Sequence, residues 1–141
     1  MLGPDSPDYF TFSIKVNRYI TDYTRLRGEK ALQLWYKFTK MLERISYKID
    51  FWLFKMPPSF KYTSENLQTL NKFFDDTKLE NKAVIEFRDP SKVTDRIENI
   101  GIVFCSVDAP KLPRVRIVSN KTVYLRIIYC NEIVYSSIHL T

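Results

Sequence analysis

The stretch Glu29–Met56 reads EKALQLWYKFTKMLERISYKIDFWLFKM, and its hydrophobic period changes partway along. In its first half the apolar residues fall three or four apart, which is the spacing of one helix face: Leu32, Trp35, Phe38, Leu42 and Ile45. In its second half they alternate with polar residues, as in a half-buried strand: Ile45, Tyr47, Ile49, Phe51 and Leu53. We therefore predict a helix over 29–43 that leads into a strand over 45–55. Because no glycine marks the junction, one continuous helix is the alternative.

A strand is predicted before this stretch and a second helix after it. Residues 9–20 alternate apolar and polar side chains, which is typical of a strand. Two prolines, Pro57 and Pro58, break the chain after Met56. Thr63 or Ser64 can then cap a helix over 64–76, whose inward residues are Leu67, Leu70, Phe73 and Phe74.

The rest of the chain is dominated by strand patterns. Short strands are predicted over 81–88 and 100–107. Residues 114–119, 122–130 and 133–140 are predicted as a meander joined by two-residue turns at Asn120-Lys121 and Asn131-Glu132. Runs of strands favour an α+β fold, a mainly antiparallel sheet of five to seven strands packed with about two helices. The chain divides into a flexible lead over 1–8 and a single globular domain over 9–141.

The residues needed for common catalytic and cofactor sites are scarce. The three glycines, Gly3, Gly28 and Gly101, cannot form a phosphate-binding loop or a dinucleotide fingerprint. Two cysteines, Cys105 and Cys130, and one histidine, His139, offer no metal-ligand spacing. Both thiols are expected to be buried and free, and a disulfide between them is the alternative. The sequence therefore predicts no enzyme activity, no metal and no cofactor.

Charge is distributed unevenly along the chain, whose net charge is +6. Residues 15–61 hold 11 Lys/Arg and 4 Asp/Glu (+7), residues 62–110 hold 6 and 9 (−3), and residues 111–141 hold 5 and 1 (+4). Two basic segments that flank an acidic one indicate an anionic partner, either lipid or nucleic acid, or contact between copies of the chain. Solubility alone is the other interpretation.

Four short motifs, taken in order, resemble the rhabdovirus matrix proteins. The segment YFTFSIKV at 9–16 resembles that family's first core strand, and ITDY at 20–23, with a helix carrying Leu34-Trp35, resembles its first helix. The segments YKIDFWL at 47–53 and NKTVYLRIIY at 120–129 resemble later strands. The resemblance implies a viral structural protein that self-associates, binds the inner face of the membrane and condenses the nucleocapsid during assembly and budding. A small basic RNA- or DNA-binding module is the alternative.

These interpretations assign residues and a location. Lipid contact is predicted for the basic residues of the first segment: Arg25, Arg27, Lys30, Lys37, Lys40, Arg44 and Lys48. The alternative assigns nucleic-acid contact to Arg114, Arg116, Lys121 and Arg126. No apolar run reaches the roughly 18–20 residues that span a bilayer, and no signal segment is present. The resemblance implies a location in the virion and the host cytoplasm, peripheral at the membrane.

Overall fold

The computed structural model describes residues 7–88, 102–108, 122–129 and 132–139, with side chains as far as residue 127. Six strands form one sheet, in which they lie side by side in the order of the chain. The first five strands are parallel to one another, and the sixth is antiparallel to the fifth. The strands are β1 (Phe12–Lys15), β2 (Ile49–Lys55), β3 (Ala83–Glu86), β4 (Val103–Asp108), β5 (Thr122–Tyr129) and β6 (Glu132–His139).

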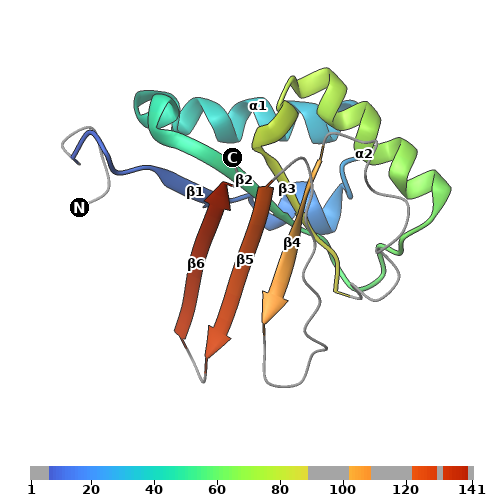
Figure 1. Ribbon diagram of the computed structural model, residues 1–141. Helices are drawn as coiled ribbons and strands as arrows, with labels where there is room; N and C mark the ends of the chain where they lie inside the picture. The colour runs from blue at the N-terminus through green and yellow to red at the C-terminus, as the bar shows by residue number, and fades with distance from the viewer. Residues whose placement is uncertain (1–6, 89–101, 109–121, 130–131, 140–141) are drawn as a thin grey trace.

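Helices connect the first three strands. The β1–β2 connection contains a π-helix, η1 (Tyr19–Tyr23), the helix α1 (Gly28–Met41) and a 3-10 segment, η2 (Glu43–Lys48). The β2–β3 connection contains α2 (Ser64–Thr77) and the short η3 (Glu80–Lys82). Parallel neighbours need such long crossover connections. Figure 1 shows both long helices on the same side of the sheet, with the β5–β6 hairpin at its far end.

The predicted mainly antiparallel sheet is wrong. The sheet is five parallel strands with one antiparallel strand at its edge. The physical reason is that both predicted helices act as crossovers, each returning the chain to the end of the sheet where it began. The predicted antiparallel pairing of the last two strands is confirmed, but β6 begins at Glu132, which was predicted to lie in the turn and is paired with Tyr129. The predicted strand over 114–119 lies outside the described residues.

The predicted change from helix to strand is confirmed, but the strand begins later than predicted. Helix α1 ends at Met41, and a 3-10 segment fills Glu43–Lys48 before β2 begins at Ile49. The alternation of apolar residues from Ile45 to Tyr47 therefore belongs to η2 and not to a strand. Likewise, β1 ends at Lys15, and the last part of the strand predicted over 9–20 enters the π-helix.

The prediction of the second helix is confirmed, including its cap. Helix α2 begins at Ser64, and the side chain of Thr63 accepts a hydrogen bond from the backbone N–H of Asn66 at 3.2 Å. A capping hydroxyl of this kind satisfies one of the N–H groups that the first helical turn leaves without a partner. Of the four predicted inward residues, Leu70, Phe73 and Phe74 are buried, and Leu67 is partly buried.

An aromatic core fills the space between the two helices and the sheet. Trp35 of α1 is 3% exposed, and its ring centroid lies 5.0 Å from that of Trp52 and 5.5 Å from that of Phe54, both on β2. Phe73 of α2 contacts the same group, 6.1 Å from Trp35. Edge-to-face and tilted contacts at these distances are the preferred aromatic geometries. Trp35 therefore belongs to the core, and it joins α1, β2 and α2.

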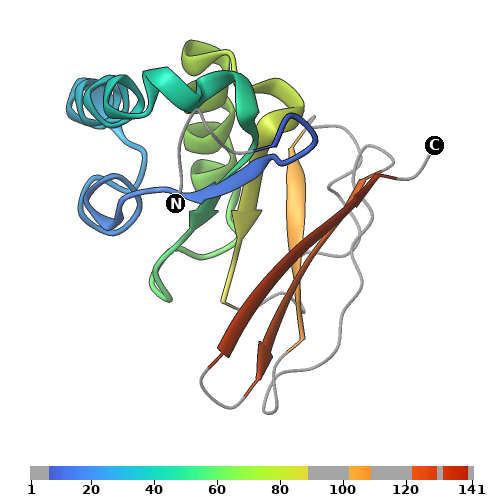
Figure 2. The same cartoon turned by 90° about the vertical axis from the view of Figure 1, so that its left-hand side faces the viewer.

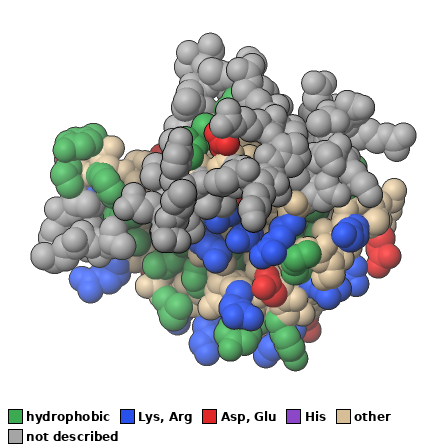
Figure 3. Space-filling model, turned by 90° about the horizontal axis from the view of Figure 1, so that it is seen from below, with side chains coloured by type: hydrophobic (Ala, Val, Ile, Leu, Met, Phe, Trp, Pro, Cys, Tyr) green, Lys and Arg blue, Asp and Glu red, His purple; other side chains and the backbone are tan. Residues whose placement is uncertain are grey.

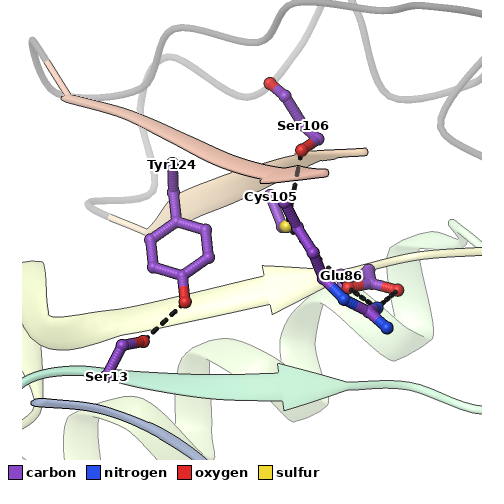
Figure 4. Close-up of polar contacts among 6 residues, drawn as sticks. Ser13, Glu86, Cys105, Ser106 and Tyr124 are labelled. Carbon is purple, nitrogen blue, oxygen red and sulfur yellow. Dashed lines mark hydrogen bonds and ion pairs between the residues drawn. The ribbon is translucent and has the colours of Figure 1, made fainter. Parts of the chain in front are cut away.

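The opposite face of the sheet is concave. Tyr124 of β5 is fully buried, packs 5.6 Å from Phe51 of β2, and shares a 2.5 Å hydrogen bond with the hydroxyl of Ser13 on β1 (Figure 4). In a flat sheet, β1 and β5 would be separated by four strand spacings, roughly 19 Å. A single side chain bridges them here, so the sheet is curled into a half-barrel. Figure 2 shows the hairpin turned away from the helices.

Candidate functional site

Charged side chains gather where the parallel strands end. Lys15 and Lys55 are the last residues of β1 and β2, Glu86 is the last of β3, and Asp108 is the last of β4. Because these strands are parallel, their carboxyl ends lie at one edge of the sheet. Figure 3 views the molecule from this side and shows Lys and Arg side chains gathered beside few acidic ones. This edge is therefore the basic end of the half-barrel.

A pocket of about 280 Å³ opens at this edge, next to β1 and β2. Four of its lining residues are basic, namely Lys15, Arg18, Lys55 and Arg88, whereas Asp22 is its one acidic lining residue. Its lining also includes Met56 and the two prolines that follow β2. We call this hollow the basic pocket. Four cations in a concave site form a local positive potential that attracts anions.

The protonation of Lys55 in the basic pocket is perturbed. Partial burial lowers the pKa of its ammonium below the ordinary value of 10.5, and the Arg126 guanidinium lowers it further. Glu86 acts in the opposite direction, whereas Arg88 and Lys15 add to the lowering. Positive charges therefore outnumber negative ones around the Lys55 ammonium, and an anion bound in the pocket would offset their repulsion.

Glu86, which is paired with Lys55 in the register of β2 and β3, belongs to a buried ion pair. Nη1 of Arg126 donates to both carboxylate oxygens of Glu86 at 2.6 Å, and both side chains are nearly inaccessible to solvent (Figure 4). The thiol of Cys105 lies 3.8 Å from the same carboxylate. Burial and the nearby Glu86 charge raise the pKa of this thiol, so Cys105 is held as a neutral thiol. The pair joins β3 to β5 across the concave face.

Of the seven residues predicted to contact lipid, six are exposed and one is buried. Exposed positions are occupied by Arg25, Arg27, Lys30, Lys37, Lys40 and Arg44. Arg27 is engaged by α2, since its guanidinium lies 2.9 Å from the Asn66 amide oxygen and 3.4 Å from the Glu65 carboxylate. Lys48 is buried, and its ammonium donates to the backbone oxygen of Pro7 at 3.0 Å. None of these seven residues lines the basic pocket.

Of the residues assigned to nucleic acid, Arg126 alone lies within the described residues. It is buried in the ion pair with Glu86. Arg114, Arg116 and Lys121 lie outside the described residues, as does the side chain of Cys130. Cys105 is confirmed as a buried free thiol.

The residues that sequence reasoning missed are Lys15, Arg18, Lys55 and Arg88. In the structure, each lies at the end of a strand or within three residues after it. Lys55 and Arg88 also end predicted strands, which is the signal that could have identified them, whereas Lys15 and Arg18 lie inside the strand predicted over 9–20. A basic residue at a strand end indicates a shared site only when the strands are known to be parallel, because the carboxyl ends of parallel strands lie at the same edge of the sheet.

Two kinds of feature are absent from the described part of the chain. No helix there is long and apolar enough to cross a membrane. No group of three His, Cys, Asp or Glu side chains there is placed to hold a metal ion.

The fold and the pocket define a class of protein: a parallel strand–helix sheet curled into a half-barrel, with a basic pocket at the carboxyl edge. The chain belongs to the family described as "Protein of unknown function DUF72", whose model matches residues 4–139. It is similar to a solved crystal structure of a DUF72 family protein (TM1631) from Thermotoga maritima MSB8, with 26% sequence identity and a TM-score of 0.57. The similarity covers 77% of this chain but 44% of that chain. No curated protein matches the chain.

The family match corrects the predicted identity. The resemblance to rhabdovirus matrix proteins is wrong, because the model that matches nearly the whole chain is that of DUF72 and the similar structure is a bacterial DUF72 protein. The predicted matrix function in assembly and budding is wrong for the same reason, and no finding supports the virion as the location. The alternative identity, a small RNA- or DNA-binding module, is likewise overturned by the match to DUF72. The expected partners (membrane, nucleocapsid, nucleic acid and a second copy) and the expected lack of enzyme activity stay predictions.

Proposed function

We propose that the chain binds a small phosphate-bearing ligand in the basic pocket. The observation that carries the proposal is that Lys15, Arg18, Lys55 and Arg88 line one hollow at the carboxyl edge of parallel strands. In the related barrels built of alternating strands and helices, ligands and active sites lie at this edge. That analogy of fold supports the location, and the four side chains support the charge of the ligand.

The chemistry of the pocket favours phosphate over a single carboxylate. A phosphate monoester carries about two negative charges and three acceptor oxygens, so several cations can engage it at once. Arginine adds a planar fork of donors that matches phosphate geometry, while lysine acts as a point charge. The carboxylate of Asp22 lines the same pocket and accepts from the hydroxyl of Thr21 at 2.9 Å. It offsets one of the four positive charges and leaves a surplus for the ligand.

The first prediction concerns removal of single charges from the pocket. Lys55→Met and Arg18→Met are each expected to weaken the binding of methyl phosphate about tenfold, because each removes one charge-assisted hydrogen bond. Methionine keeps the apolar stem of the side chain, so packing changes little. Isothermal titration calorimetry at low ionic strength measures the dissociation constants.

Lys30→Met is the matched control. It removes one positive charge from an exposed position on α1, outside the basic pocket. The control is expected to bind methyl phosphate like the unchanged protein. If Lys30→Met weakens binding as much as Lys55→Met, the affinity comes from net charge and the pocket proposal is wrong. Absence of binding to the unchanged protein also contradicts the proposal.

The second prediction concerns pH. The pKa of Lys55 is lowered, so its ammonium loses its proton at a lower pH than an ordinary lysine. A bound anion favours the charged form and raises that pKa, so binding takes up a proton in the alkaline range below 10.5. Methyl phosphate is already a dianion there, because its second pKa is about 6. Affinity is therefore expected to fall as pH rises through the lowered pKa of Lys55.

Calorimetry at one alkaline pH in buffers of different ionisation enthalpy measures this proton uptake. The unchanged protein is expected to take up a fraction of a proton for each ligand bound, whereas Lys55→Met takes up less. Equal uptake by the two proteins would show that Lys55 does not contact the anion.

A further inference from the structure

A second hollow adjoins the basic pocket. It has a volume of about 280 Å³, and its walls include the aromatic residues Phe60, Tyr62 and Phe87. We call it the aromatic pocket. Pro58 and Arg88 line both hollows, so the two pockets meet at these side chains. Lys61 also lines the aromatic pocket and adds a second cation beside its apolar wall.

The aromatic walls are held rigidly by one another. The ring of Phe87 is stacked on Phe60 with centroids 6.0 Å apart and an angle of 25°, and on Phe104 at 6.1 Å and 15°. Tyr62 stands nearly perpendicular to Phe87, at 6.0 Å and 84°. Phe60 and Phe87 are almost fully buried, whereas Tyr62 is partly exposed. Tyr62 therefore presents a ring to the hollow from a fixed position, at a right angle to the stacked row.

The local sequence explains why these rings lie beside the cations. Phe87 and Arg88 directly follow Glu86, the last residue of β3, and Phe60 and Tyr62 follow the two prolines after β2. Strands β2 and β3 are parallel neighbours, with Lys55 paired to Glu86. The two segments that leave these strands are thus adjacent, and each supplies residues to both pockets.

We infer that the ligand of the basic pocket carries an aromatic ring next to its phosphate and that the ring occupies the aromatic pocket. This inference rests on the proposed function. A planar ring gains stacking or edge contacts with the partly exposed Tyr62 that an alkyl group does not. Arg88 lies between the two hollows, where its guanidinium can pair with the phosphate and face the ring.

Three probes of graded structure test the inference: inorganic phosphate, methyl phosphate and phenyl phosphate. Phenyl phosphate is expected to bind about fivefold or more tightly than methyl phosphate, because aromatic stacking adds to the charge contacts. Tyr62→Leu is expected to abolish this advantage and to leave the binding of methyl phosphate unchanged. Lys55→Met is expected to weaken both esters by a similar factor.

Tyr62→Phe is the matched control, since it keeps the ring. The Tyr62 hydroxyl is buried and has no hydrogen-bond partner within the described ranges, so its loss leaves the fold and the preference for phenyl phosphate intact. Equal binding of methyl and phenyl phosphate, with loss of both in Lys55→Met, would overturn the aromatic inference and leave the proposed function standing. Failure of all three probes to bind would overturn both.

Discussion

Arg126→Met is expected to lower the free energy of unfolding by about 3–5 kcal/mol, because it leaves the buried carboxylate of Glu86 without its cation. Both oxygens of that carboxylate accept from Nη1 of Arg126, and the two side chains are 5% and 6% exposed. Water therefore cannot replace the lost partner. Urea denaturation, followed by tryptophan fluorescence or circular dichroism, measures the change.

A double variant separates the cost of an unpaired charge from the value of the pair. Glu86→Leu combined with Arg126→Met replaces the ion pair by apolar side chains, and it is expected to recover most of the stability that Arg126→Met loses. Arg25→Met, which removes an exposed arginine, is expected to change stability by less than about 0.5 kcal/mol. If Arg126→Met is as stable as Arg25→Met, the pair is solvated and does not fasten β3 to β5.

Local elements of the fold could be predicted from the sequence because local physics decides them. The apolar spacing around Trp35 specified α1, and the Thr63 cap with its following apolar residues specified α2. The change of period after Ile45 correctly placed a strand after α1, although the intervening 3-10 segment shifted its start to Ile49. Each of these signals spans only a few residues, so it can be recognised from the sequence without knowledge of the tertiary structure.

The direction of the strands could also have been inferred, but the signals conflicted. The predicted order was strand, helix, strand, helix and strand up to residue 88, which is the alternation typical of parallel sheets. The runs of strands in the last third of the chain were given more weight than this alternation, and they suggested an antiparallel meander. That prediction holds for β5 and β6, which are antiparallel, but it does not extend to the first five strands.

The basic pocket could not be found by scanning for local clusters of charge. Lys15, Lys55 and Arg88 lie 40 and 33 residues apart, and the parallel register alone brings them to one edge. The anion-binding site was instead predicted at the basic residues on and near α1, because these residues are close in sequence. A local cluster on a helix surface is the commoner pattern, whereas a site at the ends of parallel strands is assembled from distant residues.

Trp35→Ala is expected to lower the free energy of unfolding by about 3–5 kcal/mol, the range for removal of a large buried aromatic side chain. The ring contacts Trp52 and Phe54 on β2 and Phe73 on α2, so no single neighbour can close the cavity. The loss should appear as a lower urea midpoint with an unchanged slope.

Tyr36→Ala provides the control from the adjacent position of the same helix. Tyr36 is 55% exposed, and its hydroxyl reaches the backbone oxygen of Asp76 at 3.5 Å, which is a long hydrogen bond. We expect this variant to lose less than about 1 kcal/mol, since the ring is mostly exposed and removes far less buried surface than Trp35 does. Helix propensity changes in the same direction in both variants, so the difference between them isolates packing. Equal losses in the two variants would mean that α1 is held by its exposed face and not by the aromatic core.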